Sequence, residues 1–184
     1  MNPPSDDFRS PDTLTPVALG DHLARLVWEN FTDFIASGDA EIHVEDLGVP
    51  TREGLPPQHT VEEALIFLMW THTRGAQLAF VGRAPDDLLH EALDELHSAI
   101  FEDLVEHGTP ESYLPLFEQH VSARYAEYHQ AAEESDEELG RAVAAHLTRD
   151  DPAGTRLPAG LADRARALVA PLEDFLDEIE LIAG

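Results

Sequence analysis

The sequence predicts an all-α protein, a single helical bundle of about six helices around a central hydrophobic helix at about residues 60–81. Three observations support this fold class. Apolar residues recur every three or four positions in successive segments, which is the period of an amphipathic helix. Short stretches with glycine and proline separate these segments, and no convincing strand pattern is seen. The chain has 184 residues, 43% of them hydrophobic, which suffices for one domain with its own core.

The N-terminal third is predicted to hold a leader, a helix and a loop. Residues 1–14 are rich in proline and aspartate, and we expect them to be disordered. Thr15 followed by Pro16 is typical of a helix N-terminus, because threonine caps the first turn and proline fits its first position. This helix is expected to end at Gly38. Residues 39–59 contain several prolines and glycines, and we expect a loop that packs over the core.

The central helix is the most hydrophobic segment of the chain. Thr60 and Glu63 have the spacing of a capping box, in which two side chains satisfy amide groups at the helix start. Apolar residues then surround the helix on nearly all sides as far as Val81, which indicates a helix buried in the middle of the bundle. Gly75 costs about 1 kcal/mol there relative to alanine, and we expect a close contact between helices at this point.

Two further helices follow. Pro85 and the two aspartates after it begin the third helix, since negative charge stabilises the positive end of a helix dipole. Gly108 ends it. The fourth helix starts at Pro110 and bends, or starts again at Pro115, because proline cannot donate the hydrogen bond of a helix interior.

The C-terminal segment is predicted to contain the last two helices. Ser135 and Glu138 form a second capping box, which opens the fifth helix. After a loop, the last helix is predicted over residues 159–182. On this interpretation residues 15–184 form one all-α domain. Alternatively, residues 150–184 are a peripheral appendage that binds a partner.

The charge of the chain indicates an environment. All 11 basic residues are arginine, and they stand against 37 aspartates and glutamates, so the formal net charge is −26. Such a surface repels itself in dilute buffer, whereas in molar salt the Debye length is only about 3 Å. We therefore predict a protein from the cytoplasm of a salt-accumulating halophile. A GC-rich genome would also explain the missing lysine, but not the excess of acidic residues.

The composition argues against several classes of function. A nucleic-acid-binding surface needs clustered basic residues, and the arginines here are scattered. An anionic membrane would repel the surface, and the longest apolar run is far too short to span a bilayer. Without cysteine, the chain has no thiolate or Cys-ligated zinc. No phosphate-binding loop, nucleophile elbow or zinc-protease motif is present, and we expect no cofactor.

The first candidate site is a metal site formed by His90, Asp94 and His97. These residues lie at i, i+4 and i+7, which places them on one face of the third helix. Imidazole and carboxylate groups are common ligands of zinc and iron. Di-iron sites in helical bundles need matching groups on further helices, and no obvious partner exists. A solvated helix face is the alternative interpretation.

The second candidate is a polar break in the central helix, formed by Trp70, His72, Arg74 and Gln77. A bundle interior with a few convergent polar groups can bind a small ligand. The alternative is a structural network, because polar groups are costly to bury without partners. We predict that Arg74 pairs with a carboxylate from another helix, since a lone buried guanidinium is too costly.

The third candidate is the pair Tyr125 and Tyr128 on the fourth helix. Tyrosines at helical spacing are usually half-buried at the rim of a core, with the hydroxyl group in water. A contact surface for another protein is the functional interpretation.

These features favour a non-enzymatic interaction protein that acts through protein–protein contact, with a protein partner or with itself as a homodimer. The lack of a catalytic motif is the main reason. Apolar residues outside the main helices, such as Val44, Val49 and Leu55, offer a contact surface. The alternative is a metal- or small-ligand-binding helical bundle, with enzymes included in that class.

Overall fold

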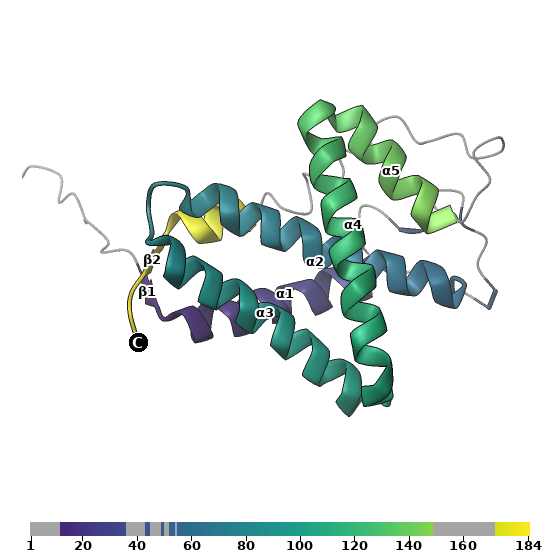
Figure 1. Cartoon of the computed structure of the whole chain (residues 1–184), viewed down its shortest axis with the longest axis horizontal. Helices are drawn as coiled ribbons and strands as arrows, with labels where there is room; N and C mark the ends of the chain where they lie inside the picture. Colours follow the sequence, from purple (N-terminus) through teal and green to yellow (C-terminus); the bar gives the residue numbers. More distant parts are fainter. Residues whose placement is uncertain (1–11, 36–42, 45–48, 50–51, 54, 149–171) are drawn as a thin grey trace, which may run out of the picture.

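The computed structural model describes residues 12–35, 43–44, 49, 52–53, 55–148 and 172–184, and it confirms the all-α fold (Figure 1). The elements are α1 (Pro16–Ile35), α2 (Gln58–Phe80), α3 (Asp86–Glu106), the short 3-10 helix η2 (Glu111–Tyr113), α4 (Leu114–Glu134) and α5 (Asp136–Thr148). Residues 172–177 are also helical and belong to the predicted last helix. The stop expected at Gly38 lies outside the described residues.

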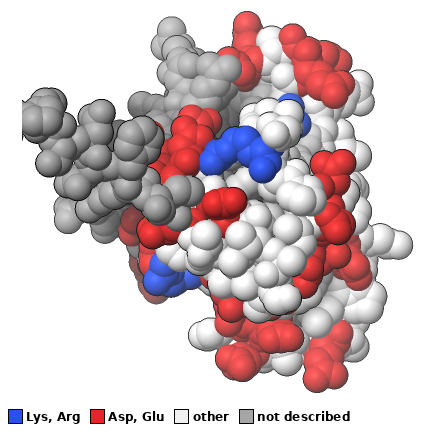
Figure 2. All heavy atoms as spheres, turned by 90° about the vertical axis from the view of Figure 1, so that its left-hand side faces the viewer, with Lys and Arg blue, Asp and Glu red and all other residues white. Residues whose placement is uncertain are grey.

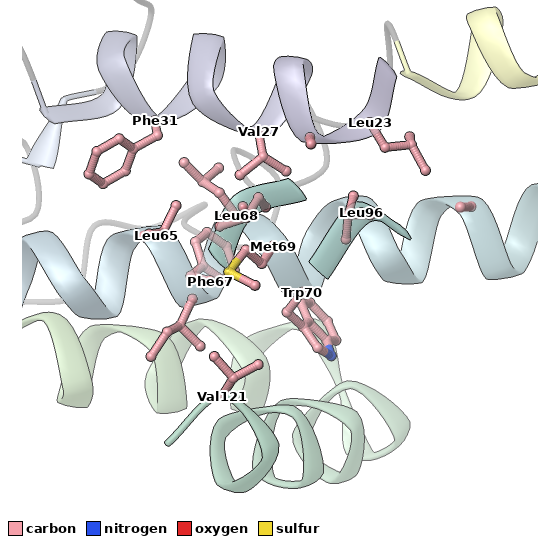
Figure 3. Close-up of a cluster of buried hydrophobic side chains, with 14 of the residues drawn as sticks. Leu23, Val27, Phe31, Leu65, Phe67, Leu68, Met69, Trp70, Leu96 and Val121 are labelled. Atoms are coloured by element: carbon pink, nitrogen blue, oxygen red, sulfur yellow. The ribbon is translucent and has the colours of Figure 1, made fainter. Parts of the chain in front are cut away.

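Helix α2 lies at the centre of the molecule, as predicted. Helices α1 and α3 pack against each other and against one side of α2, and the hairpin α4–α5 crosses its other side (Figure 1). Every residue from 63 to 73 is buried, so the middle of α2 has no solvent-facing side. Leu68 points toward Val27 of α1, whereas Trp70 points away from α1 and toward the helix that carries Val121 (Figure 3).

The tightest contact between described helices at a glycine joins α1 to α3. A Cβ atom added at Gly20 would lie 2.5 Å from the Cβ of Glu95 and 2.7 Å from the carbonyl oxygen of Ala92. Real Cβ atoms do not approach so closely, so glycine is required for this spacing of the two helices. The sequence suggested such a contact at Gly75, which is buried in α2.

Several predicted helix ends are confirmed. The Thr15 hydroxyl accepts a hydrogen bond from the amide of Ala18 at 3.3 Å, and the Ser135 hydroxyl accepts one from the amide of Glu138 at 3.1 Å. Gly108 follows α3 with a φ of +100°, a conformation that favours glycine. Helix α4 starts at Leu114, with Pro115 in its first turn, so the chain restarts there and does not bend.

The predicted capping box at Thr60 is wrong. Helix α2 begins two residues earlier, because the carbonyl oxygen of Pro57 accepts the amides of Thr60 and Val61 at 2.9 and 3.1 Å. The Thr60 hydroxyl is therefore free to donate to the carbonyl oxygen of Leu147 in α5, at 2.8 Å. Thr60, which the sequence pattern predicted as a helix cap, instead joins α2 to α5.

Both ends of the described chain also differ from prediction. Residues Asp12–Leu14 form strand β1, although they belong to the predicted leader, and they pair in parallel with strand β2, Ile179–Leu181. The last helix ends at residue 177 and does not reach 182. Arg83, after α2, donates to the carbonyl oxygens of Leu176, Asp177 and Ile179 at 3.3, 3.0 and 3.1 Å and so fixes this segment. A ladder between opposite ends of a chain leaves no local pattern.

The surface is acidic on the face that carries the two strands. Aspartate and glutamate are spread over this face, with few arginines among them (Figure 2). Within the described part of the chain, no helix is long and apolar enough to cross a membrane.

Candidate functional site

A cleft of about 950 Å³ opens where α2 meets η2, α4 and α5. Its described lining residues are His59, Glu62, Glu63, Tyr113, Leu116, Gln119, His120, Ala123, Arg124, Ala145 and His146. Most of these side chains are charged or polar, and they come from four different elements. The cleft is therefore where the fold brings charged groups together from distant parts of the sequence.

Glu63 of α2 is the most buried carboxylate of the cleft, with a side chain only 7% exposed. Arg124 of α4 holds it with two parallel hydrogen bonds, from Nε to Oε2 and from Nη2 to Oε1, both 2.8 Å long. Burial alone would raise the pKa of Glu63, but the hydrogen bond and the charge of Arg124 outweigh burial and lower it. Glu63 is thus an ionised group in an apolar helix, compensated by one arginine.

His120 of α4 lies between two neighbouring carboxylates. Its Nδ1 is 2.8 Å from Oε1 of Glu62, and its Nε2 is 3.0 Å from Oε1 of Glu63. The ring donates from Nδ1 to the Glu62 carboxylate, which only accepts hydrogen bonds, and its Nε2 forms an ion pair with Glu63 when the ring is protonated. Tyr113 of η2 donates its hydroxyl proton to Oε2 of Glu62 at 2.9 Å.

The network continues into α5 through Glu127. Nε2 of His146 lies 2.8 Å from Oε2 of Glu127, and Nη1 of Arg124 lies 3.8 Å from the same oxygen. Glu127 stands at the edge of the cleft and lines a smaller hollow between α4 and α5. An unbroken series of charged contacts therefore links α2, α4 and α5.

Two buried aromatic residues lie beside this network. The ring centroids of Trp70 and Tyr128 are 5.6 Å apart in an edge-to-face arrangement, and Tyr128 is fully buried. Among the residues that the structure describes, neither the Trp70 indole nitrogen nor the Tyr128 hydroxyl finds a hydrogen-bond partner. Burial, and then the nearby charge of Glu63, raise the pKa of Tyr128. The phenol therefore stays neutral beside the charged groups.

The four residues predicted as a ligand pocket are not brought together in a cavity that the described residues line. Trp70 packs on the α4 side of α2, whereas His72 faces α1. His72 donates from Nδ1 to the carbonyl oxygen of Leu68 at 2.8 Å and accepts at Nε2 from the Asn30 amide at 3.0 Å. Burial lowers the pKa of His72 to about 4, so this histidine is a neutral core residue. Gln77 is half-buried.

The prediction that Arg74 pairs with a carboxylate from another helix is wrong for the described residues. No aspartate or glutamate among them lies within 4.0 Å of its guanidinium group, and Arg74 is only half-buried. The expected pair exists with its members exchanged: α2 contributes the carboxylate of Glu63, and α4 contributes the guanidinium of Arg124. A charge of α2 is thus paired across helices, as its burial requires, but this charge is Glu63 and not Arg74.

The predicted metal ligands His90, Asp94 and His97 share a helix but have different surroundings. His90 and Asp94 are exposed. His97 donates from Nδ1 to the carbonyl oxygen of Leu93 at 2.6 Å, and its Nε2 accepts from the Tyr125 hydroxyl at 3.0 Å, so both ring nitrogens are occupied. Within the described ranges, no group of three His, Asp or Glu side chains is placed to hold a metal ion.

Of the two tyrosines predicted as an interface, Tyr128 is an interior residue and Tyr125 is half-buried, as expected for the rim of a core. Tyr128 is 0% exposed, and the hydroxyl of Tyr125 is bonded inside the chain to His97 and, at 3.2 Å, to Thr73. The Tyr128 ring therefore offers no contact surface to another protein, and the Tyr125 hydroxyl is already bonded within the chain. Val44 and Val49, suggested for the same purpose, are buried as well, whereas Leu55 is 64% exposed. These apolar residues serve mainly the protein's own core.

None of the residues that converge in the cleft was predicted from the sequence as a site residue; these are Glu62, Glu63, His120, Arg124 and His146. One signal was available. Two adjacent glutamates directly precede the most hydrophobic run of the chain, and an acid at such a position needs a partner. The spacing of Thr60 and Glu63 also fits a capping box, which would satisfy Glu63 locally, so the sequence pattern does not require a partner from another helix.

Comparisons of the chain with protein-family models, with curated proteins and with solved structures gave no match. The function is therefore inferred from the cleft itself.

Proposed function

We propose that this protein is a non-enzymatic binding protein whose cleft between α2, α4 and α5 takes an organic cation. The bound group is an alkylammonium or a guanidinium, supplied by a free polyamine or by a basic side chain of a protein partner. The charge of the lining carries the proposal. Two carboxylates, Glu62 and Glu63, stand against one permanent cation, Arg124, with Glu127 at the edge.

The charge balance favours a cation over an anion. With neutral imidazoles the cleft keeps an excess of negative charge, and the net charge of −26 on the whole chain repels anions and attracts cations. A carboxylate oxygen accepts more than one hydrogen bond, so Glu62 can take a further N–H group while it holds Tyr113. The two carboxylates can therefore accept further hydrogen bonds, but they cannot donate any.

The shape of the cleft also suits such a ligand. Its volume of about 950 Å³ lies within the range of small-molecule pockets, about 300–1,000 Å³. Leu116, which is 59% exposed, lies in its wall together with Ala123 and Ala145. An alkyl chain can pack against these groups while its ammonium end reaches the carboxylates.

Calorimetric titration with spermidine tests the proposal, first in dilute buffer and then in molar KCl, which covers the predicted halophilic setting. We expect saturable binding of one spermidine per chain. Glu62→Gln should weaken it by about tenfold or more, because it removes a charge-assisted hydrogen bond. A lysine-rich peptide is titrated in parallel, and binding of the peptide alone would assign the cation to a protein partner.

Glu102→Gln is the matched control, because Glu102 is an exposed glutamate of the groove between α1 and α3. It should leave the affinity unchanged. An equal loss in both variants would mean general attraction to an acidic surface and would contradict a site. Binding of citrate in place of spermidine and peptide would contradict the choice of a cation.

A further inference from the structure

We infer that an organic cation enters this cleft in exchange for a proton of His120, so that the site binds its ligand more tightly as the pH rises. The inference rests on the proposed function and adds its regulation. Its basis is the position of the His120 ring, which touches Glu62 with one nitrogen and Glu63 with the other, at 2.8 and 3.0 Å.

The imidazolium of His120 already occupies the place of a bound cation. Nδ1 is hydrogen-bonded to Glu62, and a second ring nitrogen 3.0 Å from the Glu63 carboxylate is favourable only when it also carries a proton, which gives the ring a positive charge. A ligand ammonium group that donates to the same two oxygens makes the positive charge of His120 redundant and repulsive. The ring then loses one proton to the solvent, and the ammonium group of the ligand supplies the positive charge between Glu62 and Glu63 in place of the imidazolium.

Other groups around the ring do not substitute for His120 in this exchange. The titratable or charged groups that face it are His59, Glu62 and Glu63 from α2, Tyr113 from η2, Arg124 and Glu127 from its own helix, and His146 from α5. Arg124 keeps its charge at every accessible pH, and Tyr113 donates to Glu62 as a neutral group. His146 is paired with Glu127 instead of the two α2 carboxylates. Only His120, among the described residues, contacts both carboxylates with a side chain that can exist with or without a positive charge.

Titration with spermidine at a series of pH values measures the exchange. In the acidic part of the range, affinity should rise by up to about tenfold per pH unit, which is the limit for release of one proton per ligand. Calorimetry in buffers of different ionisation enthalpy should count the proton directly. Imidazole ¹⁵N spectra of the ligand-free protein should show both ring nitrogens of His120 protonated in that range.

His120→Gln should bind spermidine with no proton release and with a flat pH profile, and it should bind more tightly than the native protein at low pH. His146→Gln is the matched control and should keep most of the slope. Circular dichroism confirms that each variant is folded, with His120→Asn as the substitute if the glutamine variant is not.

Each result has a distinct meaning. Binding of spermidine without proton release, or an unchanged slope in His120→Gln, overturns the exchange and leaves the proposed function standing. If the slope is lost in His146→Gln but kept in His120→Gln, the released proton comes from His146, and the exchange at His120 is overturned as well. Absence of cation binding at every pH refutes the proposed function and the exchange together.

Discussion

Two places in the molecule are hollowed at the surface: the seam between α1 and α3, and the junction of α2 with α4 and α5. They differ in whether their carboxylates are paired with side chains of other helices. The seam carries a groove of about 790 Å³, whose acidic lining residues are Asp21, Glu29, Asp33, Glu102, Asp103 and Glu106. One side-chain hydrogen bond between described residues crosses it, from the Trp28 indole to Asp103 at 2.7 Å. At the junction, by contrast, Glu62 and Glu63 are both bonded across helices.

The difference shows how a very acidic chain uses its carboxylates. Apolar packing and the tight contact at Gly20 hold α1 to α3, so the acids of that groove other than Asp103 are exposed to water and contribute charge. At the junction, carboxylates enter the protein and need partners. The pKa of Glu63 is lower in the folded protein than its ordinary value of 4.5. This pairing therefore stabilises the fold fully above about pH 4.5, and the stabilisation is lost as the pH falls through the folded-state pKa. Substitutions that leave a cavity should therefore lower stability on the α1–α3 side, and substitutions that remove a charge should lower it at the junction.

The largest expected effect tests the apolar side of the comparison. Leu68 is 0% exposed and faces α1, so Leu68→Ala should leave a cavity and lower the free energy of unfolding by about 2–5 kcal/mol. Denaturant unfolding in molar KCl measures it. Leu78→Ala, at a position of the same helix that is 56% exposed, should change stability by less than about 0.5 kcal/mol. Similar losses in the two variants would mean that α2 is not packed as described.

A pH effect on the α1 side would sharpen the comparison. The folded pKa of His72 is about 4, against an ordinary value of 6.5, so on acidification the unfolded chain takes up its proton first. Stability should therefore fall by about 3 kcal/mol from this residue between pH 6.5 and pH 4. His72→Gln should flatten that part of the pH profile, whereas the exposed control His90→Gln should not. An unaltered profile in His72→Gln would contradict the assignment of this acid sensitivity to His72.

The charged junction itself is tested by Arg124→Met. This change leaves Glu63 buried with only His120 as a partner, and we expect a loss of about 2–3 kcal/mol, below the full cost of breaking a buried pair because Arg124 is 19% exposed. Chemical unfolding is the measurement. Arg74→Met, in which no described carboxylate is stranded, should lose much less. Replacement of both partners, Arg124→Met with Glu63→Leu, should recover most of the loss, and a further loss instead would contradict the stranded-charge explanation.

The smallest expected effect concerns the rim of the junction. Tyr113→Phe removes one hydrogen bond to Glu62 but keeps the ring, so stability should fall by about 1 kcal/mol. Differential scanning calorimetry compares it with the native protein. If the hydroxyl also orients Glu62 for a ligand, spermidine affinity should fall together with stability. An increase in affinity would show that Tyr113 competes with the ligand for Glu62.

Sequence reasoning predicted the fold much better than the site. The segments rich in periodic apolar residues became helices, since that signal is repeated many times within each element. The site is hidden in the sequence because each of its residues also has a local explanation. Glu63 fits a capping box, and Tyr128 fits the rim of a core, although both are buried against other helices. Burial on a second face of a helix cannot be seen in the pattern of one helix.

The sequence by itself determined three of the helix ends, because Thr15, Ser135 and Gly108 act within one turn of the backbone. It also determined that residues 63 to 73 would be enclosed, since apolar groups on every side must leave water. Only the tertiary structure decided which charges meet. Glu63 and Arg124 are 61 residues apart, and a bond between them depends on how α4 crosses α2. That crossing is set by the packing of whole helix faces, which is a property of the assembled bundle rather than of any single segment.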